Sequence, residues 1–289
     1  MNLADIKAIL NYSAFRPEPD DPSAPWNRRF PNTRTVLVGL GKSMIAWAGV
    51  SKTGKILDTD TMRGDLKEIL TAAAPSMKAA SEAAWCAISL NTRYVISLET
   101  NLPRRPGSEE MMKTNPRSIL GGRYERGKRY ALTHNPETNS SVLLSIDEEQ
   151  IRKVELMFKE VGLQIGRICC GSYVLLRHAL SVTNTVKGSE KPTSNLYVIC
   201  SQGAVCVLVQ DADRWMELRS RTDVYEEDMQ PVADLLAPFR ERIHSEMGIV
   251  IACDQPTPML RECIDKALPG HAVTDLTTPD FLWNLMNHS

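Results

Sequence analysis

The chain carries TVLVGLGKSMIAWAGVSKTGKILDTDT at residues 35–61 and NLYVICSQGAVCVLVQDADRWMELRSR at residues 195–221. In both stretches an apolar run leads to a polar turn with a glycine, Gly41 or Gly203, and then to a second apolar run, another polar turn and a third extended run. Strand-forming runs separated by turn residues are typical of a β-meander. Two copies predict two similar lobes that face each other across a cleft, with the glycine turns beside it.

The composition excludes several classes of protein. The chain has 289 residues, is 43% hydrophobic and carries a formal net charge of -1, so it can bury a large core and has no overall field for nucleic acid or an anionic membrane. It contains no apolar run of bilayer length and does not begin like a secretory signal. Seven cysteines without a CxxC pair argue against a disulfide framework or a zinc site, and the five histidines lack metal-ligand spacing. We therefore expect a reduced, cytoplasmic protein.

The order of predicted elements is that of an α/β protein with mixed sheets flanked by helices. In the first half we expect, after the meander, a helix over about 62–82, strands at 85–91 and 93–99, a hairpin of 129–135 with 141–146, a helix from Asp147 to Gly162, a strand and another helix. Residues 100–129 show no clear pattern. In the second half we expect a long helix near 225–247, a buried strand at 248–254, and then a helix, a short strand and a final helix.

These patterns divide the chain into three parts. Residues 1–34 form a proline-rich arm, 35–184 form a first lobe with an insertion at about 92–146, and 185–289 form a second lobe. The polar, turn-rich stretch 182–195 supplies the boundary between the lobes.

The order of elements resembles that of the actin-like ATPase superfamily, a duplicated ribonuclease H-like fold. More narrowly, it is similar to PilM-type proteins of type IV pilus assembly and GspL-type proteins of type II secretion. The likeness lies in SVLLSIDEEQIRKVELMFKEVGLQIGRICCGSYVLLRHAL (141–180) and in the strand–turn–strand LYVICSQGAVCVLVQ (196–210). It implies a two-lobed fold and a cytoplasmic protein with protein partners at a membrane-associated platform, recruited to the inner membrane by a partner.

The resemblance also implies where a nucleotide would bind. In active members the first turn of each meander cradles phosphate and carries an acid that orients hydrated Mg²⁺ or the attacking water. That acidic position falls on Gly39 in the first turn and on Ser201 in the second. The loop that packs on adenosine, glycine-rich in the superfamily, is 252–257 here and contains no glycine. We therefore expect a non-catalytic scaffold without a bound cofactor, in which ATP hydrolysis has been lost.

Two other functions stay open. An ATP-binding protein with atypical loops would use polar groups of the two turns, with a metal ion near Asp254. The residues nominated for this alternative are Gly41, Lys42, Ser43, Ser201, Gln202, Gly203 and Asp254. A relative of sugar or metabolite kinases would need a catalytic base, and the sequence offers no clear one. The run GLGKS (39–43) is not a P-loop, because Val36 stands where the full motif has glycine and a strand rather than a helix follows.

A basic segment lies within the predicted insertion. RSILGGRYERGKRY (117–130) contains a single acid, Glu125, and the basic residues Arg117, Arg123, Arg126, Lys128 and Arg129. A solvated surface is the ordinary interpretation of such a segment. If the segment binds a partner, we expect an acidic protein surface rather than a nucleic acid, because the rest of the chain has no basic field.

Overall fold

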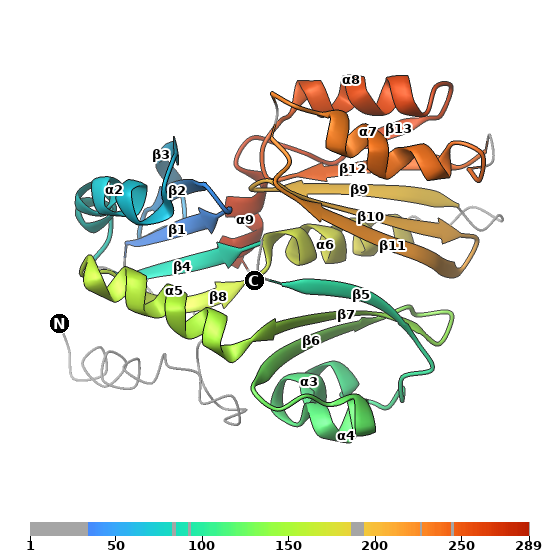
Figure 1. The fold of residues 1–289 in the computed structure, drawn as a ribbon, viewed down its shortest axis with the longest axis horizontal. Coiled ribbons are helices and arrows are strands. Elements are labelled where there is room, and N and C mark those ends of the chain that lie inside the picture. The colour runs from blue at the N-terminus through green and yellow to red at the C-terminus, as the bar shows by residue number, and fades with distance from the viewer. Residues whose placement is uncertain are drawn as a thin grey trace.

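The computed structural model describes residues 34–82, 85–91, 94–185, 194–225, 227–243 and 246–288. It shows two lobes, each built on a five-stranded sheet, and a smaller three-stranded subdomain (Figure 1). Nearly all of the expected proline-rich arm, and most of the expected boundary at 182–195, lie outside the described residues.

The first lobe is a mixed sheet in the order β3-β2-β1-β4-β8. Its strands are β1 (Thr35–Leu40), β2 (Met44–Val50), β3 (Ile56–Arg63), β4 (Trp85–Leu90) and β8 (Gln164–Cys169). The meander β1–β2–β3 is antiparallel, whereas β4 pairs parallel with both β1 and β8. Helices α2 (Leu66–Ala80) and α5 (Glu148–Glu160) bury their apolar sides in one core with this sheet.

The second lobe repeats this plan in the order β11-β10-β9-β12-β13. Its strands are β9 (Asn195–Ser201), β10 (Ala204–Asp211), β11 (Arg214–Thr222), β12 (Gly248–Cys253) and β13 (Val273–Asp275). Here too the meander is antiparallel and the last two strands pair parallel. Helices α7 (Gln230–Leu236) and α8 (Pro258–Ala267) cover its outer face. The expected duplication is confirmed.

The insertion is a subdomain with its own small core. Strands β5 (Val95–Thr100), β6 (Lys128–His134) and β7 (Ser140–Asp147) form an antiparallel sheet in the order β5-β7-β6. The stretch without a clear pattern holds helices α3 (Ser108–Thr114) and α4 (Pro116–Leu120) and the short η2 (Gly121–Arg123). The hairpin expected at 129–146 is confirmed as β6 and β7.

Two helices fill the space between the sheets. Helix α6 (Gly171–Thr185) follows β8 of the first lobe but packs against β9, β10 and β12 of the second. Helix α9 (Phe281–His288) comes from the second lobe and packs against α6 and β1. The resulting core is continuous between the lobes, because Leu37, Leu176, Ile199 and Leu282 all belong to it.

The expectation of a long helix near 225–247 is wrong. Tyr225 and Asp228 form an isolated bridge, α7 ends at Leu236, and a short 3₁₀ turn η3 (Ala237–Phe239) follows. Pro238 explains the break, because it lacks the N–H that a helix would need and its ring clashes with the preceding turn. Asp147 does precede α5 as expected, but its side chain makes no capping hydrogen bond.

Candidate functional site

The glycine turns of the two lobes meet in the interior. Between β1 and β2, the N–H of Gly41 donates to the carbonyl of Met44 at 3.0 Å. Between β9 and β10, Gln202 and Gly203 have φ angles of 39° and 75°, as a tight hairpin turn of the primed type requires. Glycine adopts this conformation freely, whereas Gln202 holds it at some cost.

The side chain of Gln202 packs directly against the first lobe. A Cβ at Gly39 would lie 2.5 Å from Gln202 Cδ, and one at Gly41 would lie 2.8 Å from the Gln202 carbonyl oxygen. Gln202 is 4% exposed. Glycine is needed at both positions because only a backbone without side chains permits this approach. The position that the resemblance assigns to a carboxylate, Gly39, is thus covered by the amide of the other lobe.

The amide of Gln202 is satisfied within the protein. Its Oε1 accepts hydrogen bonds from Asn91 Nδ2 at 2.8 Å and from Ser201 Oγ at 3.0 Å. Its backbone N–H donates to Asp254 Oδ2 at 2.9 Å, and its Nε2 donates to the same oxygen. Buried polar groups that are fully paired hold a packing arrangement in place, because separating them leaves donors and acceptors without partners.

Asn91, which follows β4, is the centre of this network. Its Nδ2 lies 3.2 Å from the hydroxyl oxygens of both Ser89 and Ser201, and its Oδ1 accepts the backbone N–H of Ser172 at 3.0 Å. Gly171 begins α6 beside it, and a Cβ there would come within 2.4 Å of Ser89 Oγ. The network therefore joins β4, α6 and the β9–β10 turn with almost no access to solvent.

Asp254 closes the network at the end of β12. Its Oδ1 accepts the backbone N–H of Gln255 at 3.0 Å. Burial raises the pKa of Asp254 to about 6, although the hydrogen bonds from Gln202 and Gln255 oppose that shift. Among the described residues, no three His, Cys, Asp or Glu side chains gather as a metal site would require. The role of Asp254 beside a metal ion stays a prediction.

The other two nominated phosphate contacts lie at the rim and also contact the opposite lobe. Lys42 Nζ forms an ion pair with Asp223 Oδ2 at 3.0 Å, and Ser43 Oγ shares a hydrogen bond of 2.9 Å with the hydroxyl of Tyr225. Arg63, at the end of β3, stacks over the ring of Tyr225 at 5.3 Å and pairs with Glu227. The polar groups nominated for phosphate are thus engaged in contacts between the lobes.

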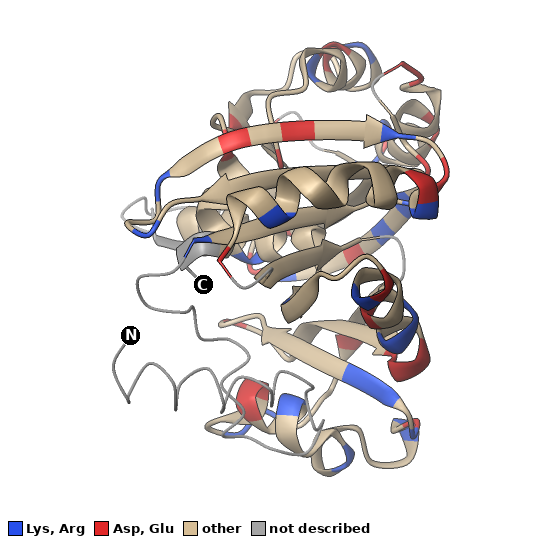
Figure 2. Cartoon of the chain, turned by 90° about the vertical axis from the view of Figure 1, so that its left-hand side faces the viewer, with Lys and Arg blue, Asp and Glu red and all other residues tan. Residues whose placement is uncertain are grey.

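The basic residues of the insertion do not form one free patch, because three of the five are paired with acids. Figure 2 shows Lys and Arg interspersed with Asp and Glu along the ribbon of the chain. Arg129 makes a two-pronged ion pair with Glu148 and is 11% exposed. Arg123 pairs with Glu99 at 2.6 Å and Lys128 with Glu125 at 2.7 Å. Within the described part of the chain, Arg117 and Arg126 are exposed without an ion-pair partner.

Comparisons with known proteins identify the fold. No family model matches the chain, and no curated protein matches its sequence. A chain of the PilM–PilN type IV pilus biogenesis complex superposes with a TM-score of 0.57 at 10% identity, over 88% of this chain and 90% of that one. The chain has an actin-like fold.

Two other actin-like structures are similar over most of their length. The cytoplasmic domain of EpsL, an inner-membrane component of the type II secretion system of Vibrio cholerae, has a TM-score of 0.49 at 11% identity and is covered to 93%. A Bacteroides thetaiotaomicron protein with an actin-like ATPase fold and unknown function has a TM-score of 0.48 at 10% identity and is covered to 96%. Each match spans 88% of this chain. The helices of the described residues include none long and apolar enough to cross a membrane.

Proposed function

We propose that this actin-like chain is a non-catalytic cytoplasmic scaffold in a type IV pilus or type II secretion assembly platform. Its lobes present surfaces to membrane-anchored protein partners, which recruit it to the inner membrane. The fold that it shares with a chain of the PilM–PilN complex supports the assembly class, and the contact between its two glycine turns supports the absence of catalysis.

The observation that carries the proposal is the position of Gln202. Its side-chain amide fills the space next to Gly39 and is bonded to Asn91 and Asp254. Its backbone carbonyl lies against Gly41. A nucleotide phosphate placed between the turns would have to displace this buried amide and break its hydrogen bonds. An acid at position 39, as in an active member, would collide with the same side chain.

The ATP-binding alternative has less support. It needs Lys42, Ser43, Ser201 and Gln202 to turn toward a ligand, yet these residues bond to the opposite lobe or to the interior. Binding would therefore require the lobes to separate, and the ligand's affinity would be reduced by the free energy of that opening.

Isothermal titration of the full chain with ATP and Mg²⁺ tests the closed arrangement. We expect no saturable heat and no phosphate release. Saturable binding at micromolar affinity would overturn the proposal that the cleft is closed and would favour the alternative.

A separate experiment tests the scaffold role. Deleting the gene in its own organism should abolish surface pili or type II secretion, and the Lys42→Ala chain should restore the lost function as well as the native chain does. Normal piliation and secretion in the deletion strain would contradict the assembly role while leaving the closed cleft untouched.

A further inference from the structure

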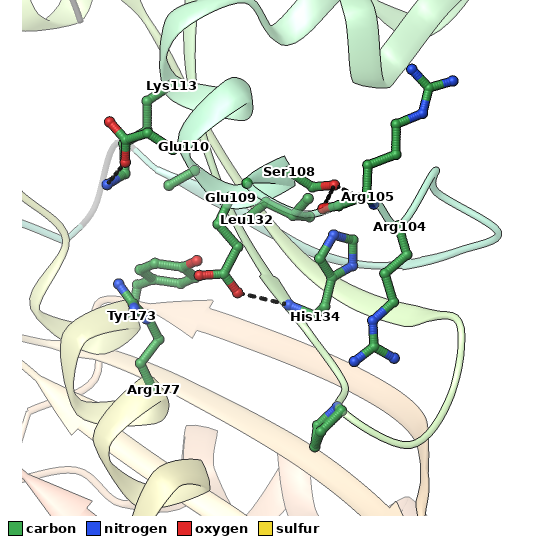
Figure 3. Close-up of a pocket in the computed structure, with 13 residues that line it drawn as sticks. Arg104, Arg105, Ser108, Glu109, Glu110, Lys113, Leu132, His134, Tyr173 and Arg177 are labelled. Atoms are coloured by element: carbon green, nitrogen blue, oxygen red, sulfur yellow. Dashed lines mark hydrogen bonds and ion pairs between the residues drawn. The ribbon is translucent and has the colours of Figure 1, made fainter.

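A cavity of about 520 Å³ lies away from the glycine turns, where the inserted subdomain meets α6 (Figure 3). One wall comes from α3 and the chain before it, with Arg104 and Glu109. A second comes from β6 and the turn after it, with His134, and the third is α6, with Tyr173 and Arg177. Small-molecule sites are commonly about 300–1,000 Å³, so the cavity has room for a small organic ligand.

The lining of the cavity carries excess positive charge. Lys113 and Glu110 pair with each other at 3.0 Å on the rim and cancel. That leaves Arg104 and Arg177 against the carboxylate of Glu109. Arg105 also borders the cavity, but Figure 3 shows its guanidinium directed away from the other lining side chains. In the described part of the chain none of these three arginines has a carboxylate within ion-pair distance.

The partners of these arginines are weak ones. Arg104 Nη1 lies 3.4 Å from the carbonyl oxygen of Thr138, and Arg177 stands 5.9 Å from the centre of the Tyr173 ring. A guanidinium offers five N–H donors in a planar fork that fits a carboxylate or a phosphate. Most of the donors of Arg104 and Arg177 are therefore available to a ligand.

His134 lines the cavity but keeps both ring nitrogens away from it. Its Nδ1 shares a hydrogen bond of 2.8 Å with Ser141 Oγ, whereas its Nε2 is buried without a partner. When Nδ1 accepts the Ser141 hydroxyl proton, the ring proton lies on Nε2. A buried N–H without an acceptor is costly, but Nε2 has almost no accessible surface, so this nitrogen does not face a ligand in the cavity.

The remaining groups set the polarity of the site. Glu109 Oε1 accepts the backbone N–H of His134 at 3.2 Å, which spreads part of its charge. Leu132 and Ala131 add an apolar surface from β6. A ligand that fits would combine an anionic group for the arginines with a short carbon body.

We propose that this cavity binds a small organic dianion, a phosphate monoester or a dicarboxylate, held between Arg177 of α6 and Arg104 of the inserted subdomain. A phosphate monoester carries a charge of about −2 near neutral pH, so it can pair with both arginines. The site is independent of the glycine turns and of the scaffold role, so each can fail without the other.

The test is titration of the full chain with phenyl phosphate, phenylsuccinate and the neutral benzyl alcohol, followed by calorimetry and by amide chemical shifts. We expect saturable binding of a dianion and none of benzyl alcohol. Preference for phenyl phosphate identifies a phosphate site, and preference for phenylsuccinate identifies a dicarboxylate site.

Variants then locate the site. Arg104→Gln and Arg177→Gln should each weaken binding by about 10-fold or more, as expected for a hydrogen bond to a charged group. Glu109→Gln should tighten binding, because it removes the only unpaired acid of the lining. Arg126→Gln is the matched control, an exposed arginine of the same subdomain outside the cavity, and should bind as the native chain does.

Circular dichroism and thermal melting confirm that each variant is folded before its affinity is compared. Absence of saturable binding for both dianions, or equal affinity in the native, Arg104→Gln and Arg177→Gln chains, would overturn the proposal. Weaker binding of the dianions to Glu109→Gln would also overturn it, because loss of a carboxylate beside a bound anion should relieve repulsion.

Discussion

The two glycine turns have the same place in their lobes but opposite surfaces. The turn of the first lobe presents backbone only, at Gly39 and Gly41, whereas the turn of the second presents the side chain of Gln202. The turn of the first lobe leaves a recess, and Gln202 of the second lobe fills that recess. The difference shows that two copies of one fold have become complementary to each other, where a pair of similar phosphate loops would both face a ligand.

The strongest way to break this complementarity is to fill the recess. Gly39→Asp restores a carboxylate but pushes it into Gln202 and buries its charge, so we expect a loss of about 4 kcal/mol in the free energy of unfolding. Urea unfolding followed by tryptophan fluorescence measures it. Gly122→Ala is the matched control, since a Cβ there meets nothing within 4 Å, and should change stability by less than about 0.5 kcal/mol. A stable Gly39→Asp chain that binds ATP would contradict the closed arrangement.

The charge of Asp254 gives the next effect. The folded state raises its pKa from 3.8 to about 6, so the folded state holds the proton more tightly than the unfolded state does. The contribution of Asp254 to the free energy of unfolding therefore falls as pH rises from about 4 to 6, by up to about 3 kcal/mol. Asp254→Asn lacks this dependence.

The measurement is the difference in unfolding free energy between the native and Asp254→Asn chains at several pH values from 4 to 7. The native chain should lose stability relative to the variant as pH rises. A difference in unfolding free energy that does not change with pH, or that shifts in favour of the native chain as pH rises, would contradict the raised pKa of Asp254.

Removing the amide itself should have a smaller effect. Gln202→Ala removes one hydrogen bond from Asn91 and one from Asp254, both in a buried network, which costs about 2 kcal/mol. Gln202→Gly should cost about 1 kcal/mol less than that, because glycine adopts the positive φ of this position without strain. Urea unfolding of the two variants measures this difference. A Gln202→Gly chain less stable than Gln202→Ala would show that the backbone conformation at this position adds no strain.

The ion pair of Lys42 with Asp223 at the rim of the glycine turns should contribute least to stability. Lys42→Ala removes an ion pair whose lysine side chain is 66% exposed, so we expect a loss of less than about 1 kcal/mol that disappears at high salt. Lys55→Ala, in the turn between β2 and β3, is the control. A larger loss than for Gln202→Ala would show that the rim, and not the buried amide, holds the turns together.

The sequence predicted the fold where its signals were local. Alternation of apolar runs and turn residues located both meanders, and Gly162 ends α5 in the left-handed conformation expected of it. The long helix expected near 225–247 was wrong, because the α-helix ends at Leu236, before Pro238. The proline-rich arm and the basic segment as a partner surface stay predictions.

The site could be predicted only in part. Gln202 was singled out as a ligand contact, but its partner Asn91 was not, because the two are 111 positions apart and only the packed lobes bring them together. One signal was present. Gly39 interrupts an apolar strand, and a glycine within a strand often marks a close approach by another backbone or side chain.

The core that runs between the lobes has a consequence for how the molecule melts. Leu176 of α6 and Leu282 of α9 belong to the same buried cluster as residues of both sheets. Each lobe contributes one helix that packs against the other lobe. Neither lobe can lose its structure without exposing the hydrophobic surface of its neighbour. Scanning calorimetry should therefore show one endotherm whose van't Hoff and calorimetric enthalpies agree, as for a single cooperative unit.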